Sequence, residues 1–396
     1  MRDDVLIIGA GPAGLAAAWE LGRIGIGFRL IDRADRIASS WRSRHDQLRL
    51  NTHRIFSHQP GRRMPRRLGA YPTRDDYIAY LEDYVDWSGL PVEFGYNATR
   101  IDAIPPDGWR IASNRGDLLA RHVVVATGSD RLPWMPAWPG MERFRGTIVH
   151  AGAFRHASDY IGKRVLLVGA GNSGVDIGNH LSAVDIAPSW VYIRNGPTIA
   201  PQYAFGVPTH PLLASLRWLP IAVQDFNVAL ASRLALGDLT RYGIPRPPKG
   251  ALTRQIEDGV TLAVDCGFVA ALKAGRFTAV PPIESFAPES VRLTDGRRIE
   301  PDAVICATGY RLGLEPLVGH LGVLDQAGRP RWLADRGSPT HPGLWFFGQN
   351  SSTYGNMNIR RSEARRLAKA IRSELDRRER RAPTAVAMRP TGGDDP

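Results

Sequence analysis

Two short apolar runs in this chain are each followed directly by a glycine-rich turn and then by a segment of helical character. The first run is Val-Leu-Ile-Ile at residues 5–8, and the second is Val-Leu-Leu-Val at residues 165–168. Apolar runs of this length that end at turn residues are typical of buried strands. The pattern therefore predicts two strand-turn-helix units, with the first helix over residues 15–23.

Both turns carry the spacing Gly-x-Gly-x-x-Gly. Small residues at these positions let the backbone approach a pyrophosphate, whose charge is then held by the amide groups and dipole of the helix N-terminus. One such motif is weak support, but strand, loop and helix in this order make a chance match uncommon. We therefore expect two bound dinucleotides. The residues expected to contact them are Gly9, Gly11, Pro12, Ala13 and Gly14 in the first loop, and Gly169, Gly171, Asn172, Ser173 and Gly174 in the second.

Each unit has a second predicted strand, and the two strands end differently. Residues 27–31 lead to Asp32, whose carboxylate is placed, with Arg33 beside it, to accept hydrogen bonds from an adenosine ribose. Residues 190–193 lead instead to Arg194, whose guanidinium suits a 2′-phosphate that a carboxylate would repel. The difference favours FAD at the first site and NADPH at the second. A solvent-exposed charge at a strand end is the plain alternative for both residues.

A hairpin followed by a strand that ends in Ala-Thr-Gly recurs after each glycine loop. Residues 109–120 alternate around a turn before one apolar run, and residues 291–300 do so before the other. This internal repeat predicts an α/β fold with two doubly wound, Rossmann-like dinucleotide-binding domains, the second inserted into the first. Small residues after a strand allow close approach to a cofactor. Those expected here are Thr127, Gly128, Thr308 and Gly309.

The proline-rich segment 133–139 is not expected to form regular structure and predicts the crossing into the second domain, with a return near Pro301. An apolar helical insertion at about 197–249 either lines a substrate channel or packs on the sheet. The predicted domains are 1–145 and 301–376 for the two parts of the FAD-binding domain, 146–300 for the NADPH-binding domain, and 377–396 for a disordered tail.

Near the C-terminus, the apolar run 344–347 predicts a strand placed to approach the flavin ring. A loop over 351–358 and a helix over 360–374 are expected after it. The turn residues that follow the strand are Gly348, Gln349 and Asn350.

Composition narrows the class of partner. The 396 residues are 43% hydrophobic and 23% charged, as in an ordinary globular protein. A formal net charge of +12 raises the question of nucleic acid, but no nucleic-acid-binding motif accompanies the scattered arginines. We therefore expect no nucleic-acid partner, and we leave a homodimer open.

Neither a disulfide nor a metal site is expected. Cys266 and Cys306 lie far apart without a CxxC pair, and the ten histidines show no ligand spacing. Charged residues and a proline interrupt the most apolar stretch, 211–236, so no membrane span is predicted. With the first strand so close to the N-terminus, we expect no signal peptide and a cytoplasmic location.

Residues 144–154 carry a more specific pattern, Phe-x-Gly-x-x-x-His-x-x-x-Phe, with His150 at its centre. It resembles the FxGxxxHxxx-aromatic signature of flavin-containing monooxygenases, which also lies between two glycine loops. The resemblance covers roughly residues 3–375 and is strongest to the plant YUCCA-type branch and its bacterial relatives. Segments that agree are 38–42, 46–50, 71–73, 169–176, 237–238, 242–243, 246–247 and 307–310.

The resemblance implies a single-component monooxygenase. In this family NADPH reduces FAD, O2 adds at the flavin C4a, and the resulting peroxyflavin transfers one oxygen atom to a small molecule, such as a 2-oxo acid or an N or S nucleophile. The intermediate survives only where water is excluded. The Baeyer-Villiger version of the signature ends in Trp followed by Pro or Asp, whereas this one ends in Phe154-Arg155, which weakens ketone-to-ester oxidation.

Two residues are candidates for catalysis. Asn51 falls where the family places an Asn near the flavin, although a turn or cap residue is the plain alternative. His150 titrates near neutral pH, which makes it a candidate base, but the resemblance favours a structural or gating role at the domain crossing. Further cofactor contacts implied by the matching segments are Trp41, Leu48 and Asp176.

Two other classes of function compete with the monooxygenase. A flavin-dependent NADPH reductase or oxidase has the same two-nucleotide build, but the disulfide-reductase version needs a redox-active cysteine pair, which is missing here. A non-catalytic nucleotide-binding or nucleic-acid-binding protein is suggested only by the charge. Bound flavin in the purified protein would argue against this last class.

Overall fold

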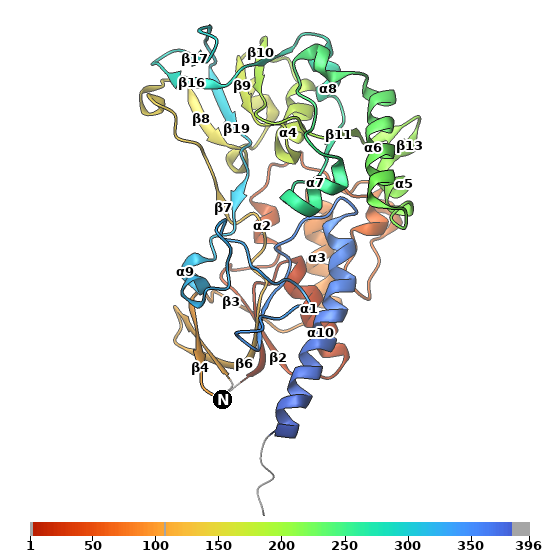
Figure 1. Ribbon diagram of the computed structural model, residues 1–396, viewed down its shortest axis with the longest axis vertical. Helices are drawn as coiled ribbons and strands as arrows, with labels where there is room; N and C mark the ends of the chain where they lie inside the picture. Colours follow the sequence, from red (N-terminus) through yellow and green to blue (C-terminus); the bar gives the residue numbers. More distant parts are fainter. Residues whose placement is uncertain (1–2, 107, 382–396) are drawn as a thin grey trace, which may run out of the picture.

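Two sheets, the first mixed and the second parallel, are separated along the long axis of the molecule and organise the fold (Figure 1). The computed structural model describes residues 3–106 and 108–381. The first sheet has the order β3-β2-β1-β6-β5-β4, with β21 also paired to β6, and the second has the order β15-β10-β9-β19-β8. This arrangement confirms the predicted fold class, two Rossmann-like units with the second inserted into the first.

The first unit contains the N-terminal part of the chain and its C-terminal helix. Its strands are β1 (Asp3–Ile8), β2 (Phe28–Asp32), β3 (Val92–Phe94), β4 (Ala98–Ile104), β5 (Gly108–Ser113), β6 (Leu118–Val125) and β21 (Leu344–Phe346). Its helices are α1 (Pro12–Arg23), α2 (Ser39–Arg42), α3 (Arg74–Ser88), α9 (Glu315–Val318) and α10 (Asn356–Arg381).

Small residues let α1 and α10 pack closely on the first sheet. One buried cluster includes Ala16 and Ala17 of α1 together with Ala364 and Ala368 of α10. Helix α3 begins with a capping box, in which the Thr73 hydroxyl accepts a hydrogen bond from a backbone amide one turn along. The glycine loop that follows β1 is therefore held on a rigid support.

The second unit supplies the parallel sheet. Its strands are β8 (Thr147–His150), β9 (Val165–Val168), β10 (Ser189–Tyr192), β15 (Phe277–Val280) and β19 (Ala303–Cys306), with an antiparallel sheet of β16 (Ile283–Phe286), β17 (Val291–Leu293) and β18 (Arg298–Ile299). Helices α4 (Asn172–Ser182) and α8 (Phe268–Lys273) pack closely, because a Cβ on Gly178 would lie only 2.5 Å from the ring of Phe268.

Both predicted hairpins are present. β5 and β6 pair antiparallel around the turn that follows Ser113, and β17 and β18 pair around Gly296. The sequence did not predict β4, which is largely exposed and mixed in polarity, so its burial pattern gives little periodic signal.

The return to the first unit was predicted too early. Strand β19 lies between β9 and β8 in the second sheet, so the chain leaves that unit after Cys306 and not near Pro301. All four residues of β19 are buried, as a central parallel strand requires, and an apolar run of this kind suits either sheet. The two crossings pair with each other as β7 (Leu132–Pro133) and β20 (Tyr310–Arg311), so Pro133 is part of regular structure after all.

The insertion after β10 is only partly helical. It contains β11 (Ile199–Pro201), β12 (Tyr203–Ala204), β13 (Val207–Pro208), α5 (Thr209–Ser215) and α6 (Ile221–Leu236), and is followed by α7 (Ala251–Asp258) and β14 (Ala263–Asp265). Short 3-10 helices lie at Arg54–Phe56, Arg66–Leu68, Met141–Arg143, Ala151–Ala153, Ala157–Tyr160, Leu239–Tyr242 and Gly319–Leu321.

Helix α10 is longer than predicted at both ends. It begins at Asn356, inside the expected loop 351–358, and continues to Arg381, inside the segment 377–396 that was expected to be disordered. The eleven added residues contain four Arg together with Leu, Met and Glu, all good helix formers, and no proline. Residues 382–396 of the predicted tail lie outside the described part of the chain.

Candidate functional site

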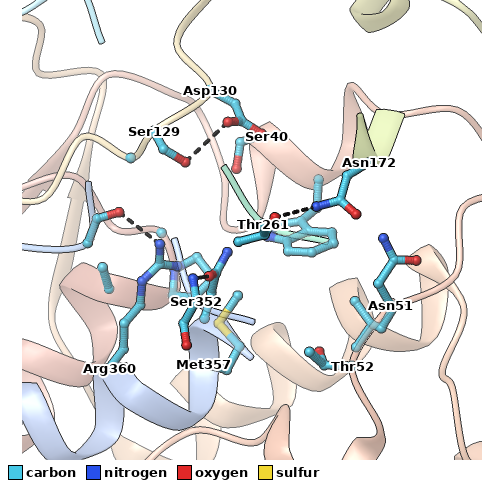
Figure 2. A pocket seen from close by; sticks show the side chains of 18 of the residues that line it. Ser40, Asn51, Thr52, Ser129, Asp130, Asn172, Thr261, Ser352, Met357 and Arg360 are labelled. Carbon is cyan, nitrogen blue, oxygen red and sulfur yellow. Dashed lines mark hydrogen bonds between the residues drawn. The ribbon is translucent and has the colours of Figure 1, made fainter. Parts of the chain in front are cut away.

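A cavity of about 760 Å³ lies between the two units. The first glycine loop contributes Gly9 to Ala13 to its wall, the second contributes Asn172 and Ser173, and helices α5 and α6 close one end. Figure 2 shows part of this wall. The cavity therefore brings together both motifs that the sequence predicted to hold dinucleotides.

The first glycine loop is shaped by backbone contacts that leave room for glycine alone. Gly9 has a φ of +110°, and a Cβ on Gly14 would lie 1.8 Å from the Gly9 carbonyl oxygen. Gly11 differs, because a Cβ there would meet nothing within 4 Å, and the residue lines the cavity. Helix α1 starts at this point without a side-chain cap, so its first amide groups are available to a ligand.

The second loop repeats this geometry. Gly169 has a φ of +97°, a Cβ on Gly174 would lie 2.0 Å from the Gly169 carbonyl oxygen, and Gly171 again faces open space. Helix α4 also lacks a side-chain cap. The three glycines do not line the shared cavity, whereas Asn172, Ser173 and Asp176 do. The loop therefore faces outward, with only its helical end reaching the junction.

The charged ends of the two second strands have different surroundings. The two carboxylate oxygens of Asp32 accept hydrogen bonds from the backbone amides of Ala10 and Ala34, at 2.6 and 2.8 Å. This ties the end of β2 to the glycine loop, and both Asp32 and Arg33 line the cavity. Arg194 is exposed and forms no hydrogen bond or ion pair with the described residues, so its guanidinium is free to bind an anion.

Asn51 lies in the cavity wall with its side chain unpaired among the described residues. Figure 2 shows its amide facing the same space as that of Asn172, which donates a hydrogen bond to the Thr261 hydroxyl at 2.7 Å. Leu48 and Trp41 also line the cavity, and Trp41 packs edge-on against Tyr77 at 4.5 Å between ring centroids.

Buried polar atoms without a partner test whether a polar cofactor fits here. The Thr127 hydroxyl and the Arg360 Nε are both buried without a hydrogen bond, and both residues line the cavity. Leaving such a group unpaired costs about 1–3 kcal/mol. A polar ligand that supplies the missing partners is favoured, and the residues present therefore fit a dinucleotide.

Sequence reasoning missed Met357 and Arg360 as cavity residues. Met357 fell in the expected loop, and Arg360 was expected only as the first residue of the helix, since no motif marks it. One Arg360 Nη donates to the Gly348 carbonyl at 2.8 Å, and burial lowers the pKa of the guanidinium. Gly348 approaches the first glycine loop so closely that a Cβ on it would lie 2.5 Å from the Cβ of Ala13.

His150 does not line the cavity. Its Nδ1 accepts a hydrogen bond from the Gly152 amide at 3.0 Å, and its Nε2 lies 2.9 Å from the Gly309 carbonyl oxygen, to which it donates. Burial lowers the pKa of the ring, so it is neutral near pH 7. With both nitrogens engaged, the ring is placed to hold the two crossings together.

Besides His150 and the glycines of the second loop, six predicted residues lie outside the cavity wall: Gly14, Arg194, Thr308, Gly309, Gln349 and Asn350. The Thr308 hydroxyl donates to the Trp134 carbonyl at the crossing, beside Gly309. The Gln349 amide donates to the Val125 carbonyl at 2.8 Å, and the Asn350 amide donates to a carboxylate oxygen of Glu363 at 3.1 Å. Thr127 and Gly128, from the equivalent position in the first unit, do line the cavity.

His210 leads to a prediction on pH. Burial lowers the pKa of this α5 side chain, which lines the cavity, from 6.5 to about 4. Below pH 6.5 His210 therefore becomes protonated in the unfolded chain but stays neutral in the folded protein. The free energy of unfolding falls as the pH drops from 6.5 towards 4. We expect about 2 kcal/mol of this loss between pH 7.5 and pH 5.

His210→Gln should remove that part of the pH dependence. The measurement is the melting temperature of the wild type and of the variant at both pH values. We expect the melting temperature to fall less between pH 7.5 and pH 5 for the variant than for the wild type. Equal falls in melting temperature would contradict the prediction.

Among residues 3–106 and 108–381, no helix combines the length and apolar character needed to cross a membrane. Both cysteines are free, Cys306 inside β19 and Cys266 at the surface, and neither lines the cavity.

Comparison with known proteins gives two family matches. The pyridine nucleotide-disulphide oxidoreductase family matches residues 6–198, and the flavin-binding monooxygenase-like family matches residues 115–318. The indole-3-pyruvate monooxygenase YUCCA1 of Oryza sativa subsp. japonica is 34% identical over 336 residues, covering 84% of this chain and 79% of that protein. The probable indole-3-pyruvate monooxygenase YUCCA7 of Arabidopsis thaliana is 36% identical over 318 residues, covering 77% and 74%.

Solved structures agree on the fold. A flavin-containing monooxygenase from Stenotrophomonas maltophilia superposes with a TM-score of 0.74 at 24% identity, covering 95% of this chain and 100% of that one. At this level of sequence identity, the structural similarity supports the fold alone, which consists of two Rossmann-type units joined by two crossing segments.

Proposed function

This chain belongs to the flavin-binding monooxygenase-like family, and from that premise we propose that it uses FAD and NADPH to transfer one atom of O2 to a small organic molecule. One observation carries the proposal. The first glycine loop, Asn51 and the helical end of the second glycine loop all line one cavity, so a flavin, a nicotinamide and a substrate can meet there.

The first unit would hold FAD. The uncapped amides at the start of α1 are suited to the pyrophosphate and Asp32 to the adenosine ribose, while Thr127 and Arg360 offer unpaired polar atoms deeper in the cavity. When bound and reduced, the flavin supplies the chemistry by which O2 reacts at its C4a carbon. The protein's contribution is to orient the ring and exclude water.

The second unit, which the chain leaves after Cys306, would hold NADPH. The uncapped start of α4 is suited to the pyrophosphate. His150 would act as a positioning residue, because its hydrogen bond to the Gly309 carbonyl joins the incoming and outgoing crossings beside this unit.

Arg194→Ala should reduce the preference for NADPH over NADH. A charge-assisted pair with a 2′-phosphate accounts for roughly a 10- to 100-fold difference in affinity, and NADH has no such group. The measurement is kcat/KM for flavin reduction by each nucleotide. We expect the value for NADPH to fall by that factor and the value for NADH to change little.

Asn195→Ala, at the next exposed position, serves as the matched control. An Arg194→Ala enzyme with the wild-type ratio of the two kcat/KM values would assign the 2′-phosphate to another residue. An equal fall in kcat/KM with NADPH and with NADH would assign Arg194 a structural role.

The helical insertion points to the substrate class. Leu212, Leu213 and Leu216 of the α5 region and Val228 and Ala231 of α6 line the cavity, which supports the interpretation of the insertion as part of a substrate channel. An apolar wall of this kind suits an aromatic or aliphatic group. The similar plant proteins are named indole-3-pyruvate monooxygenases, and we propose a 2-oxo acid with an apolar side chain as the substrate.

A 2-oxo acid gives a distinctive product balance. The acid, O2, NADPH and H⁺ yield the carboxylic acid that is one carbon shorter, CO2, water and NADP⁺. The experiment supplies 2-oxo acids labelled at the carboxyl carbon beside amines and sulfides, and measures labelled CO2 and oxygenated product. Release of CO2 with one oxygen atom gained supports the 2-oxo acid, whereas oxygenated amine or sulfide alone would favour the nucleophile class.

The competing reductase has less support. Because neither cysteine lines the cavity, no thiol pair is placed to relay electrons from the flavin. Reduction of an artificial acceptor, with no oxygenated product from any compound tested, would favour the reductase.

A further inference from the structure

Three potential metal ligands from the two units meet beside the cavity. His45 lies in the segment after α2, while Asp176 and His180 lie one turn apart on α4. One ligand atom from each lies within 4.8 Å of the others. We call these residues the His45–Asp176–His180 cluster. Asp176 also lines the cavity, whereas His45 and His180 do not.

Sequence reasoning found no ligand spacing among the histidines, and none is expected for a cluster that is built from both units. Asp176 and His180 have the i, i+4 spacing of a helical ligand pair, but the third ligand is 131 residues from Asp176 along the chain. Only the docking of the segment that carries His45 onto α4 brings the three together.

The distances are those of a metal site that needs little adjustment. His45 Nε2 lies 2.9 Å from one carboxylate oxygen of Asp176, and His180 Nε2 lies 3.6 Å from the other. Ligand atoms around a tetrahedral zinc ion, at the usual metal–ligand distances, are about 3.3 Å apart. The observed separations fall on either side of that value.

Burial and an unpaired nitrogen also indicate a missing partner. The His45 ring is 5% exposed and packs edge-on against Phe154 at 5.4 Å between ring centroids. The Nε2 of His180 is buried without a hydrogen bond. The His180 nitrogen faces the Asp176 carboxylate across a gap that is too long for a hydrogen bond.

We propose that the His45–Asp176–His180 cluster binds one zinc ion, or another late first-row divalent ion such as Co²⁺, through two imidazoles and one carboxylate. This donor set suits these ions, whereas Mg²⁺ and Ca²⁺ favour all-oxygen sites. Three protein ligands leave a fourth position for water.

A metal ion at this place would bridge the two units. The same junction already carries a hydrogen bond from Arg155 to the Ser43 carbonyl at 2.7 Å, and one from the Ala157 amide to the Gln47 side chain at 2.9 Å. Because binding requires the folded junction, bound Zn²⁺ should raise the melting temperature of the protein.

The test is a titration of untagged, chelator-treated, flavin-loaded protein with Co²⁺. Tetrahedral Co²⁺ absorbs at longer wavelengths than flavin, so its bands can be followed directly. We expect one equivalent to bind with a tetrahedral spectrum, and one equivalent of Zn²⁺ to displace it and raise the melting temperature.

His45→Gln and His180→Gln should each weaken binding by more than the roughly 10- to 100-fold that loss of an outer-shell partner costs. His156→Gln is the matched control, because His156 forms a nearby exposed pair with Asp46 at 2.8 Å but has no third ligand. If His45→Gln fails to fold, the partly exposed His180 decides the question.

Unchanged Co²⁺ binding in folded His180→Gln protein would overturn the proposal. An octahedral spectrum, or binding lost only in His156→Gln, would also overturn it. Neither the binding nor the spectrum depends on turnover, so failure here is distinguishable from failure of the proposed monooxygenase activity.

Discussion

Gly11→Ala should give a folded protein that binds FAD more weakly and is purified with less of it. A Cβ at this position meets no protein atom within 4 Å and projects towards the cavity, where the pyrophosphate is expected. Crowding of this kind costs about 1–3 kcal/mol, which weakens FAD binding roughly 10- to 100-fold. The measurement is the flavin content of the purified protein together with its FAD dissociation constant.

Two glycine variants in matched positions sharpen this test. Gly171→Ala places the same methyl group in the second loop, where a Cβ is also unobstructed, so it should retain FAD and raise the KM for NADPH. Gly14→Ala should fail to fold normally, because its Cβ would lie 1.8 Å from a backbone oxygen. If Gly11→Ala lost NADPH while retaining FAD, the two cofactors would have to be exchanged between the loops.

Asn51→Ala should separate flavin reduction from oxygen transfer. Its amide faces the cavity without a partner among the described residues, so it is free to donate a hydrogen bond to an oxygen atom beside the flavin. Loss of one such hydrogen-bond donor lowers the rate of the step that it assists by about 100-fold. We expect product formed per NADPH to fall sharply while H2O2 rises to balance the NADPH consumed.

Anaerobic reduction of the flavin by NADPH is the internal control for Asn51→Ala, and its rate should match the wild type. A variant that forms wild-type amounts of product per NADPH would leave Asn51 with the role of a turn residue. A variant that is reduced slowly would place Asn51 at the nicotinamide.

Local backbone chemistry explains why much of the fold could be predicted. The glycine loops need small residues at fixed positions, as the contacts of Gly14 and Gly174 with the loop carbonyls show. The motif therefore locates the loop, and the apolar run directly before it can be recognised as the strand. The hairpins carried the same kind of local signal. The return crossing carried none, since β19 would be equally apolar in either sheet.

The candidate site was only partly predictable for the same reason. Asp32 and Asn172 follow from the glycine-loop motifs and Asn51 from the family resemblance, and all three line the cavity. Arg360 lines it only because the first turns of α10 dock against Gly348. The His45–Asp176–His180 cluster depends on the contact between two units, which leaves no spacing in the sequence. Ligand sets built across a junction of this kind require the structure.

If the protein is a monooxygenase, one oxygen atom of O2 enters the product, and labelled O2 makes that atom traceable. The flavin-loaded enzyme is supplied with NADPH, labelled O2 and an apolar 2-oxo acid, and mass spectrometry measures label in the carboxylic acid formed, with H2O2 measured in parallel. We expect one labelled oxygen atom in each product molecule and little H2O2. Consumption of NADPH with all the label in H2O2 or water, for every 2-oxo acid, amine and sulfide tested, would contradict it.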